Sequence, residues 1–278
     1  MKDFKDKVAV ITGGASGIGL GMAEVFASEG MNLVLADIEA KPLAEAAEKI
    51  LANHDVKVEQ KLCDVSKVNE VMDLAEFSFT TFGNVNILCN NAGVAGGGGF
   101  GPIWQSSPKD WEWIMGVNLM GVVHGLQAFV SKMISSGEEG HIVNTSSILG
   151  LTSGGGSIYG VTKHAVTRLT EGLKLDLVNH KSKIGASVLC PGLIATNIIS
   201  SFRNRPSELQ NENAPQATSE ANNRFAQARK YFAEAGMSPV EVGQIVLDAI
   251  KTDKFYISTH PEMRNGVEAR FKAIMRDI

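Results

Sequence analysis

The sequence lacks the cysteine and histidine patterns that mark disulfide-rich or metal-binding proteins. Its three cysteines, Cys63, Cys89 and Cys190, stand alone at the ends of apolar runs, so we expect buried thiols rather than a disulfide framework or a zinc site. The six histidines follow no HExxH or similar arrangement. We therefore expect no bound metal ion.

The marks of membrane insertion and nucleic-acid binding are missing as well. We find no apolar stretch near the roughly 18 residues of a membrane span, and residues 1–7 contain no apolar core of a secretion signal. There are 26 Lys and Arg against 30 Asp and Glu, a net charge of −4, and no basic run. We expect a cytoplasmic protein that binds neither membranes nor nucleic acid.

What the sequence does contain is an alternation of short apolar strands and helices. The expected strands are 7–12, 31–36, 57–62, 85–90, 140–146, 184–190 and 254–258. The expected helices are 17–29, 40–53, 67–82, 108–136 and 159–180. Together with a hydrophobic content of 44%, this pattern predicts an α/β fold. It would be a doubly wound parallel sheet (Rossmann fold) of about seven strands with helices on both faces, in one domain over 1–278.

A glycine-rich turn follows the first expected strand. Residues Thr12 to Gly19 read TGGASGIG, and apolar residues at helical spacing follow them. In a strand–turn–helix unit, backbone N–H groups and the helix dipole receive a pyrophosphate. Gly13 permits the tight turn, Gly17 lets the backbone approach a phosphate, and Gly19 lets the helix pack on the strand. The turn predicts a dinucleotide-binding site.

Asp37 ends the second expected strand, 18 residues beyond Gly19. A carboxylate there accepts hydrogen bonds from the adenosine ribose hydroxyls, although an aspartate at this place can also cap a helix or stabilise a turn. A 2′-phosphate would be repelled by this charge, and the neighbouring Ser16 and Ile38 offer no cation. We therefore predict NAD(H) as the cofactor, rather than NADP(H).

Tyr159 and Lys163 form a second motif, Tyr-Gly-Val-Thr-Lys. Residues at i and i+4 share one face of a helix, which brings the lysine ammonium close to the phenol. A nearby positive charge favours the phenolate, so the tyrosine can exchange a proton with a substrate hydroxyl. The pair alone is weak evidence, since many helices carry a packed ring beside a solvated amine.

Taken together, these motifs resemble the short-chain dehydrogenase/reductase family in its single-domain branch, over about residues 7–196. The resemblance adds cofactor contacts at the ends of later strands. Asp64 and Val65 match the pair that faces adenine, and Asn91 matches the motif that closes the fourth strand. The segment after the sixth strand matches the one that contacts the nicotinamide carboxamide. The implied cofactor-binding residues are Gly13, Ser16, Gly17, Ile18, Gly19, Asp37, Asp64, Val65, Asn91, Tyr159, Lys163, Pro191, Gly192, Ile194 and Thr196.

The resemblance also implies a catalytic tetrad of Asn118, Ser147, Tyr159 and Lys163. In it, the tyrosine exchanges the proton, the lysine lowers its pKa and holds the ribose, the serine donates a hydrogen bond to the carbonyl oxygen, and the asparagine anchors a water. Ser146 competes with Ser147 for the serine position. Ser147 followed by Ile-Leu-Gly fits the family pattern better, and Ser146 would then point to the opposite face of its strand.

Three regions depart from the family pattern. Residues 94–101 are rich in glycine, which suits a loop beside the substrate or a plain surface connection equally. Residues 200–236 are long and polar, and the resemblance implies a substrate lid there. Its candidate wall residues are Phe202, Phe225, Tyr231 and Phe232, with core packing an equal alternative for the last three. An amphipathic helix over 261–278 replaces the family's frequent glycine-rich tail. Because that tail often builds an interface, both a homodimer and a homotetramer remain open.

The activity implied by the resemblance is hydride transfer between the nicotinamide of NAD(H) and a secondary alcohol or its ketone. The lid and tail are more loosely similar to those of bacterial enzymes that oxidise benzylic alcohols of lignin-derived aromatics, which suggests an apolar, aromatic or alicyclic substrate. One alternative, an NADPH-dependent carbonyl reductase, conflicts with Asp37. Another, a non-catalytic NAD-binding sensor, would need only the cofactor half of the motifs.

Overall fold

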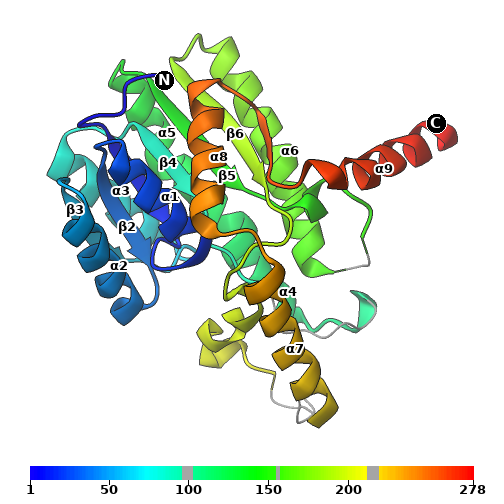
Figure 1. The fold of residues 1–278 in the computed structure, drawn as a ribbon. Helices are drawn as coiled ribbons and strands as arrows, with labels where there is room; N and C mark the ends of the chain where they lie inside the picture. Colours follow the sequence, from blue (N-terminus) through cyan, green and yellow to red (C-terminus); the bar gives the residue numbers. More distant parts are fainter. Residues whose placement is uncertain (96–102, 155–156, 212–218) are drawn as a thin grey trace.

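The computed structural model describes residues 1–95, 103–154, 157–211 and 219–278 (Figure 1). Within these residues seven parallel strands form one sheet in the order β3-β2-β1-β4-β5-β6-β7. The strands are β1 (Val8–Thr12), β2 (Asn32–Asp37), β3 (Val58–Leu62), β4 (Ile87–Asn90), β5 (Gly140–Thr145), β6 (Ile184–Cys190) and β7 (Tyr256–Ser258). The predicted doubly wound parallel sheet is confirmed.

Helices cover both faces of the sheet (Figure 1). The α-helices are α1 (Gly17–Ser28), α2 (Ala40–Asn53), α3 (Val68–Phe82), α4 (Pro108–Met115), α5 (Gly121–Ser135), α6 (Ile158–Asn179), α7 (Ser219–Ala235), α8 (Pro239–Lys251) and α9 (Arg264–Asp277). The shorter helical segments are η1 (Ile103–Gln105), the π-helical η2 (Gly116–Met120), η3 (Ile148–Gly150), η4 (Ile198–Asn204), η5 (Ser207–Leu209) and η6 (Pro261–Met263).

Two hydrophobic clusters hold these layers together. Side chains of α1, α2 and α8 pack on one face of the sheet, whereas those of α3, α5 and the end of α6 pack on the other. Successive residues of β1 alternate between the clusters, with Ala9 and Ile11 in the first and Val10 in the second. A strand buried on both faces must be apolar throughout, which is why the runs read as continuous apolar segments.

The structure corrects two details of the helix prediction. The single helix expected over 108–136 is interrupted by η2, whose π-helical turn joins α4 to α5. Helix α8 was not expected, although its start carries a capping box in the sequence. The Ser238 hydroxyl accepts a hydrogen bond from the Glu241 N–H at 3.2 Å, and the Glu241 carboxylate accepts one from the Ser238 N–H at 3.0 Å.

The stretch Pro108–Ser135 also contradicts the expectation that no apolar run approaches the length of a membrane span. By length and composition alone it could cross a bilayer. In this fold, Ala128, Phe129 and Met133 are buried in the cluster shared with α3 and the sheet. The stretch therefore has the apolar composition of a core helix.

The parallel arrangement sets the position of the site. The carboxyl ends of β1, β2, β4, β5 and β6 meet at one edge of the sheet, where ligands of doubly wound folds bind. Residues 195–236, here called the substrate-side segment, leave the fold beyond β6 and return before α8. An isolated β-bridge between Ile194 and Met237 joins the two points. Residues 212–218 of this segment lie outside the described residues.

Candidate active site

A cleft of about 610 Å³ lies along the carboxyl ends of the strands. Every cofactor and catalytic residue expected from the sequence lines this cleft except Gly19 and Asn118, both of which are buried. Motifs separated by up to 183 positions in the chain, from Gly13 to Thr196, therefore meet in one place.

The glycine turn between β1 and α1 has the geometry that a pyrophosphate requires. Gly13 and Gly17 have positive φ angles of 64° and 53°, which other residues rarely adopt. A Cβ at Gly19 would lie 2.0 Å from the Gly13 carbonyl oxygen, so only glycine fits where α1 approaches the turn. The open turn at the helix N-terminus leaves a cradle that a side chain would fill, and the residues present fit a dinucleotide.

Asp37 joins the end of β2 to this turn. Its carboxylate accepts hydrogen bonds from the Ala15 N–H and the Glu39 N–H, both at 3.1 Å. The second bond stabilises the turn before α2, so the structural role left open in the sequence is present as well. Burial raises the pKa of the carboxyl, and the hydrogen bonds from Glu39 and Ala15 oppose that shift. Asp37 lines the cleft, where it is placed to meet a ribose.

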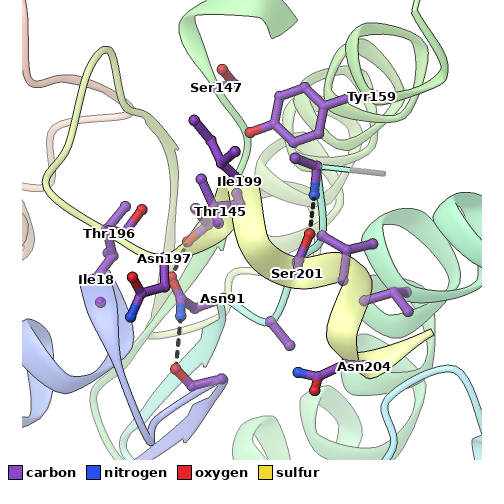
Figure 2. A pocket seen from close by; sticks show the side chains of 18 of the residues that line it. Ile18, Asn91, Thr145, Ser147, Tyr159, Thr196, Asn197, Ile199, Ser201 and Asn204 are labelled. Carbon is purple, nitrogen blue, oxygen red and sulfur yellow. Dashed lines mark hydrogen bonds between the residues drawn. The ribbon is translucent and has the colours of Figure 1, made fainter. Parts of the chain in front are cut away.

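Asn91 ties three strand ends together under the cleft. Its side-chain amide donates to the Thr12 carbonyl oxygen at 3.1 Å. Its oxygen accepts from the Thr145 hydroxyl at 3.1 Å (Figure 2). These bonds link the ends of β1, β4 and β5. The residue therefore fixes the floor on which the cofactor would rest.

Tyr159 lies in the first turn of α6, which begins when the Ser157 hydroxyl accepts a hydrogen bond from the Gly160 N–H at 3.0 Å. Figure 2 shows the Tyr159 phenol and the Ser147 hydroxyl facing the same space. Burial raises the pKa of Tyr159, and its hydrogen bond with Ser147 lowers it. Proton exchange and oxyanion binding can thus take place at one point.

Lys163 stands one helical turn beyond Tyr159, with Nζ 5.5 Å from the centre of the tyrosine ring. Its ammonium donates to the Thr145 carbonyl oxygen at 2.8 Å. Burial lowers the pKa of Lys163 to about 8. The sequence argument assumed that the lysine charge dominates the phenol. In the structure burial has the larger effect, because both groups lie in a low-dielectric environment.

The two candidate serines point in different directions. The Ser146 hydroxyl donates to the Lys163 carbonyl oxygen at 2.7 Å and contacts the Thr167 hydroxyl at 2.8 Å. Its side chain is therefore directed towards α6. The Ser147 hydroxyl accepts from the Leu149 N–H at 3.2 Å and faces the phenol. This geometry favours Ser147 as the residue that would bind the substrate oxygen.

Asn118 lies in the π-helical turn η2 and is fully buried. Its side chain accepts from the Val94 N–H at 2.8 Å and donates to the Val94 carbonyl oxygen at 2.9 Å. A Cβ at Gly93 would lie 3.4 Å from both Asn118 Oδ1 and Lys163 Nζ, so the glycine leaves open the space between them. Such π-turns are frequent at functional sites, and this one fixes the loop after β4.

The other end of the cleft has a largely apolar wall, of which sequence reasoning had named only Phe232 and, within the loop 94–101, Val94. It is lined by Val94, Trp113, Leu149, Ile198, Ile199, Leu209, Phe232 and Met263. Phe202 instead packs edge-on against Trp113 at 6.1 Å between ring centres and is 44% exposed. Phe225 and Tyr231 are exposed and do not line the cleft. No local pattern marks Trp113 or Met263, because both reach the cleft through contacts distant in sequence.

The described residues contain no group of three or more His, Cys, Asp or Glu side chains that could hold a metal ion. Most of the glycine-rich stretch, residues 96–101, lies outside the described residues. The absence of a metal and the roles assigned to residues 94–101 and to the lid therefore stay predictions.

The model of the short chain dehydrogenase family matches residues 7–207. The chain belongs to this family. A dehydrogenase/reductase of CLA biosynthesis from Lactiplantibacillus plantarum is 36% identical over 278 residues, covering 100% of this chain and 96% of the relative. A C alpha-dehydrogenase from a Sphingobium species is 34% identical over 282 residues, covering 100% and 88%. The latter agrees with the looser resemblance expected from the lid and tail.

Among solved structures, a short-chain dehydrogenase/reductase from Burkholderia phymatum in complex with NAD superposes with a TM-score of 0.92. It is 40% identical and covers 100% of this chain and 97% of that one. Less similar short-chain dehydrogenase structures contain NADPH. This short-chain dehydrogenase is therefore an oxidoreductase by family, and its relatives use both nicotinamides.

Proposed function

We propose that this short-chain dehydrogenase transfers a hydride between NAD(H) and a secondary alcohol or its ketone. The observation that carries the proposal is the placement of Tyr159, Ser147 and Lys163 between the glycine turn and the apolar wall. A binding protein would need the turn alone. The additional proton-exchanging group at the junction of the two ends of the cleft favours an enzyme.

The bound nicotinamide would supply the hydride chemistry, and the protein would supply orientation and proton transfer. In oxidation, Tyr159 takes the hydroxyl proton at its phenol oxygen, while Ser147 hydrogen-bonds the oxygen that becomes the carbonyl. Lys163, held by the Thr145 carbonyl, keeps a positive charge beneath the phenol. Asn118 accepts a hydrogen bond from the Val94 N–H, and the space at Gly93 between Asn118 and Lys163 would hold a water. In reduction the proton moves the opposite way.

The proposed substrate is apolar, aromatic or alicyclic. Among the described residues that line the cleft, the cationic side chains are Lys163, which is bonded to the Thr145 carbonyl oxygen, and Arg203, which is paired with Glu39. A carboxylate or phosphate on the substrate would find no partner there. The C alpha-dehydrogenase among the relatives supports this substrate class.

Exchange of Tyr159 for phenylalanine tests the reaction. We expect Tyr159→Phe to lower kcat by roughly 10²–10⁴-fold, with NADH binding unchanged because the ring is kept. Tyr231→Phe is the matched control, since Tyr231 is exposed and outside the cleft. Secondary alcohols and ketones would be screened with both nicotinamides by absorbance of the reduced cofactor. A Tyr159→Phe enzyme that retains more than about a tenth of the parent kcat would contradict the proposal.

The choice of NAD over NADP rests on Asp37 and agrees with the NAD-bound relative. The runner-up, an NADPH-dependent reductase, gains one supporting observation, because Arg203 lines the adenosine end of the cleft. Arg203 is, however, paired with Glu39. We expect Asp37→Ala with Ile38→Arg to raise the kcat/KM ratio for NADP over NAD. If that ratio does not move, Asp37 does not select the cofactor.

We further propose a cytoplasmic homodimer or homotetramer. Exposed apolar side chains on α6, such as Leu175 and Val178, and on α9, such as Phe271 and Met275, support self-association. Sedimentation velocity over a concentration series tests the assembly, and a monomer at all concentrations would exclude it.

A further inference from the structure

Two charged residues that line the adenosine end of the cleft have no role in the chemistry proposed above. Glu39 is the residue before α2, just beyond the end of β2, and Arg203 lies in η4, beyond β6. The Arg203 Nε donates to one Glu39 carboxylate oxygen at 3.0 Å, and Nη2 donates to the other. This is a bidentate arginine–carboxylate pair, the stronger form of surface ion pair.

The sheet order shows how far this pair reaches. β2 and β6 are separated by β1, β4 and β5, four strand spacings or roughly 19 Å along the edge of the sheet. An ion pair between residues that follow these two strands must therefore cross the mouth of the cleft. Segment η4 makes this crossing, and Arg203 lies near its C-terminal end.

Two further hydrogen bonds hold the segment around Arg203 in place. The Arg203 Nη1 donates to the Ser200 carbonyl oxygen at 3.0 Å, and the Ser201 hydroxyl accepts from the Ala95 N–H at 3.0 Å (Figure 2). Closer to β6, a Cβ at Gly17 would lie 3.1 Å from the Thr196 methyl group. The start of the substrate-side segment thus passes directly over the glycine turn.

We propose that Glu39 and Arg203 are a positioning pair that straps the adenosine half of the cofactor into the cleft and slows its release. A dinucleotide seated on the glycine turn and Asp37 would lie beneath the strap. Its departure would require the ion pair to open. The Arg203 side chain is 42% exposed and that of Glu39 is 23% exposed, so solvent ions can compete with the pair.

The strap would also connect the two ends of the cleft. Ile198 and Ile199, which line the substrate wall, belong to the same 3₁₀ segment as Arg203. A substrate that packs against these isoleucines would hold η4 down, and with it the cofactor. The inference rests on the proposed function, because it takes the cleft to bind NAD(H).

The test measures NADH release directly, without turnover. Preformed protein–NADH complex is mixed with excess NAD, and the loss of bound-NADH fluorescence gives the release rate. The variants are Glu39→Gln, Arg203→Met and the double variant. Lys174→Met is the matched control, since it removes a similar ion pair with Asp253, at 2.9 Å, outside the cleft. Thermal unfolding of each variant checks that it is folded.

We expect each single variant to release NADH about two- to fivefold faster, the range of a partly exposed ion pair. The double variant should be no faster than the faster single variant, because both remove the same interaction. Raising salt from about 50 to about 500 mM should speed release from the parent and from Lys174→Met, but not from the other variants.

Three results would overturn the strap. Release rates of both single variants could stay within experimental error of the parent, their effects could multiply in the double variant, or salt could act equally on all. Because Glu39 and Arg203 belong to separate segments, one before α2 and one in η4, local misfolding in one variant does not explain both effects. If the parent itself fails to bind NADH, the proposed function and the strap fall together. If it binds NADH but the variants match it, only the strap falls.

Discussion

At the cofactor end of the cleft the floor is made of backbone and short side chains, with the Glu39–Arg203 pair beside it, whereas the wall of the substrate end is made of long side chains. The shape of the cofactor end depends on close contact between backbone segments, as where Gly19 packs on Gly13. It also depends on hydrogen bonds between strand ends, as at Asn91. The substrate-side segment, which rejoins the fold through one β-bridge, supplies four of the eight wall residues at the substrate end. The cofactor end is thus part of the sheet itself, whereas the substrate-side segment is attached to the fold at a few points.

The main anchor of that wall is a buried ion pair. The Arg205 Nη1 donates to the Asp110 carboxylate at 2.6 Å, with the two side chains 1% and 5% exposed. The guanidinium also stacks near Trp113, at 5.4 Å from the ring centre, and donates to the Leu209 carbonyl oxygen at 2.7 Å. One arginine therefore joins α4 to the turn between η4 and η5. The comparison teaches that close backbone packing shapes the floor of the cofactor end, whereas a buried ion pair anchors the wall of the substrate end.

The substitution Arg205→Met tests whether the substrate end of the cleft can loosen independently of the cofactor end. It leaves Asp110 buried without a counter-charge, which typically costs about 3–5 kcal/mol. We expect the loss to appear as faster hydrogen exchange of amides in η4 and η5, such as that of Leu209, while amides in β1 are unchanged. Replacing both partners by apolar residues should cost much less. Equal loosening of both ends would show that they form one unit.

The second prediction addresses the cofactor end. Gly19→Ala places a methyl group 2.0 Å from a backbone carbonyl, so the turn must shift. NADH would have to restore the turn when it binds, and a cost of about 1–3 kcal/mol, as for overpacked sites, corresponds to binding weakened by roughly five- to 150-fold. Gly172→Ala is the control, because its nearest neighbour is the flexible Arg168 side chain at 3.5 Å. Titration of NADH fluorescence measures both, and unchanged affinity in Gly19→Ala would refute the role of close approach.

The third prediction, with the smallest expected effect, concerns the pH dependence of stability. It rests on a residue at the amino end of β5, away from the cleft. His141 is buried in β5 and hydrogen-bonds Ser187 at 2.7 Å, and burial lowers its pKa to about 4. Because this lies below the unfolded value near 6.5, the unfolded chain binds more protons between these values. Stability is therefore lost as the pH falls from about 6.5 towards 4, by about 1 kcal/mol at pH near 5.5.

Urea unfolding at pH near 7 and near 5.5 measures this acid sensitivity. His141→Gln should reduce it, whereas His180→Gln, at an exposed histidine, should not. A His141→Gln protein with the full sensitivity of the parent would assign the effect to another group.

The same contrast explains which features could be predicted from the sequence. Gly13, Gly17 and Gly19 shape a turn within one strand–turn–helix unit, so their spacing was sufficient to predict the tight turn. The alternation of apolar strands was sufficient for the confirmed sheet. The π-turn at Asn118 was not visible, because a composition typical of a continuous helix does not reveal an extra residue in one turn.

The substrate end was harder to predict for a physical reason. Trp113, Ile199 and Met263 come from three separate elements and meet only after the chain has folded. The four aromatic residues proposed as its wall were chosen by residue type, and only Phe232 lines the cleft. Arg203 and Glu39 are 164 positions apart, and nothing local connects them.

The β-bridge between Ile194 and Met237 has a consequence for protein engineering. Its flanking hydrogen bonds, from the Ala195 N–H to the Met237 carbonyl oxygen at 2.9 Å and from the Met237 N–H to the Leu193 carbonyl oxygen at 3.0 Å, bring the two ends of the intervening chain together. Loops with adjacent ends tolerate changes of length at low entropic cost. Residues 197–236 could therefore be exchanged between related enzymes without altering the register of the sheet, provided that Glu39 and Asp110, the partners of Arg203 and Arg205, are exchanged with them. Substrate range could then be varied by grafting, with the hydride-transfer machinery left in place.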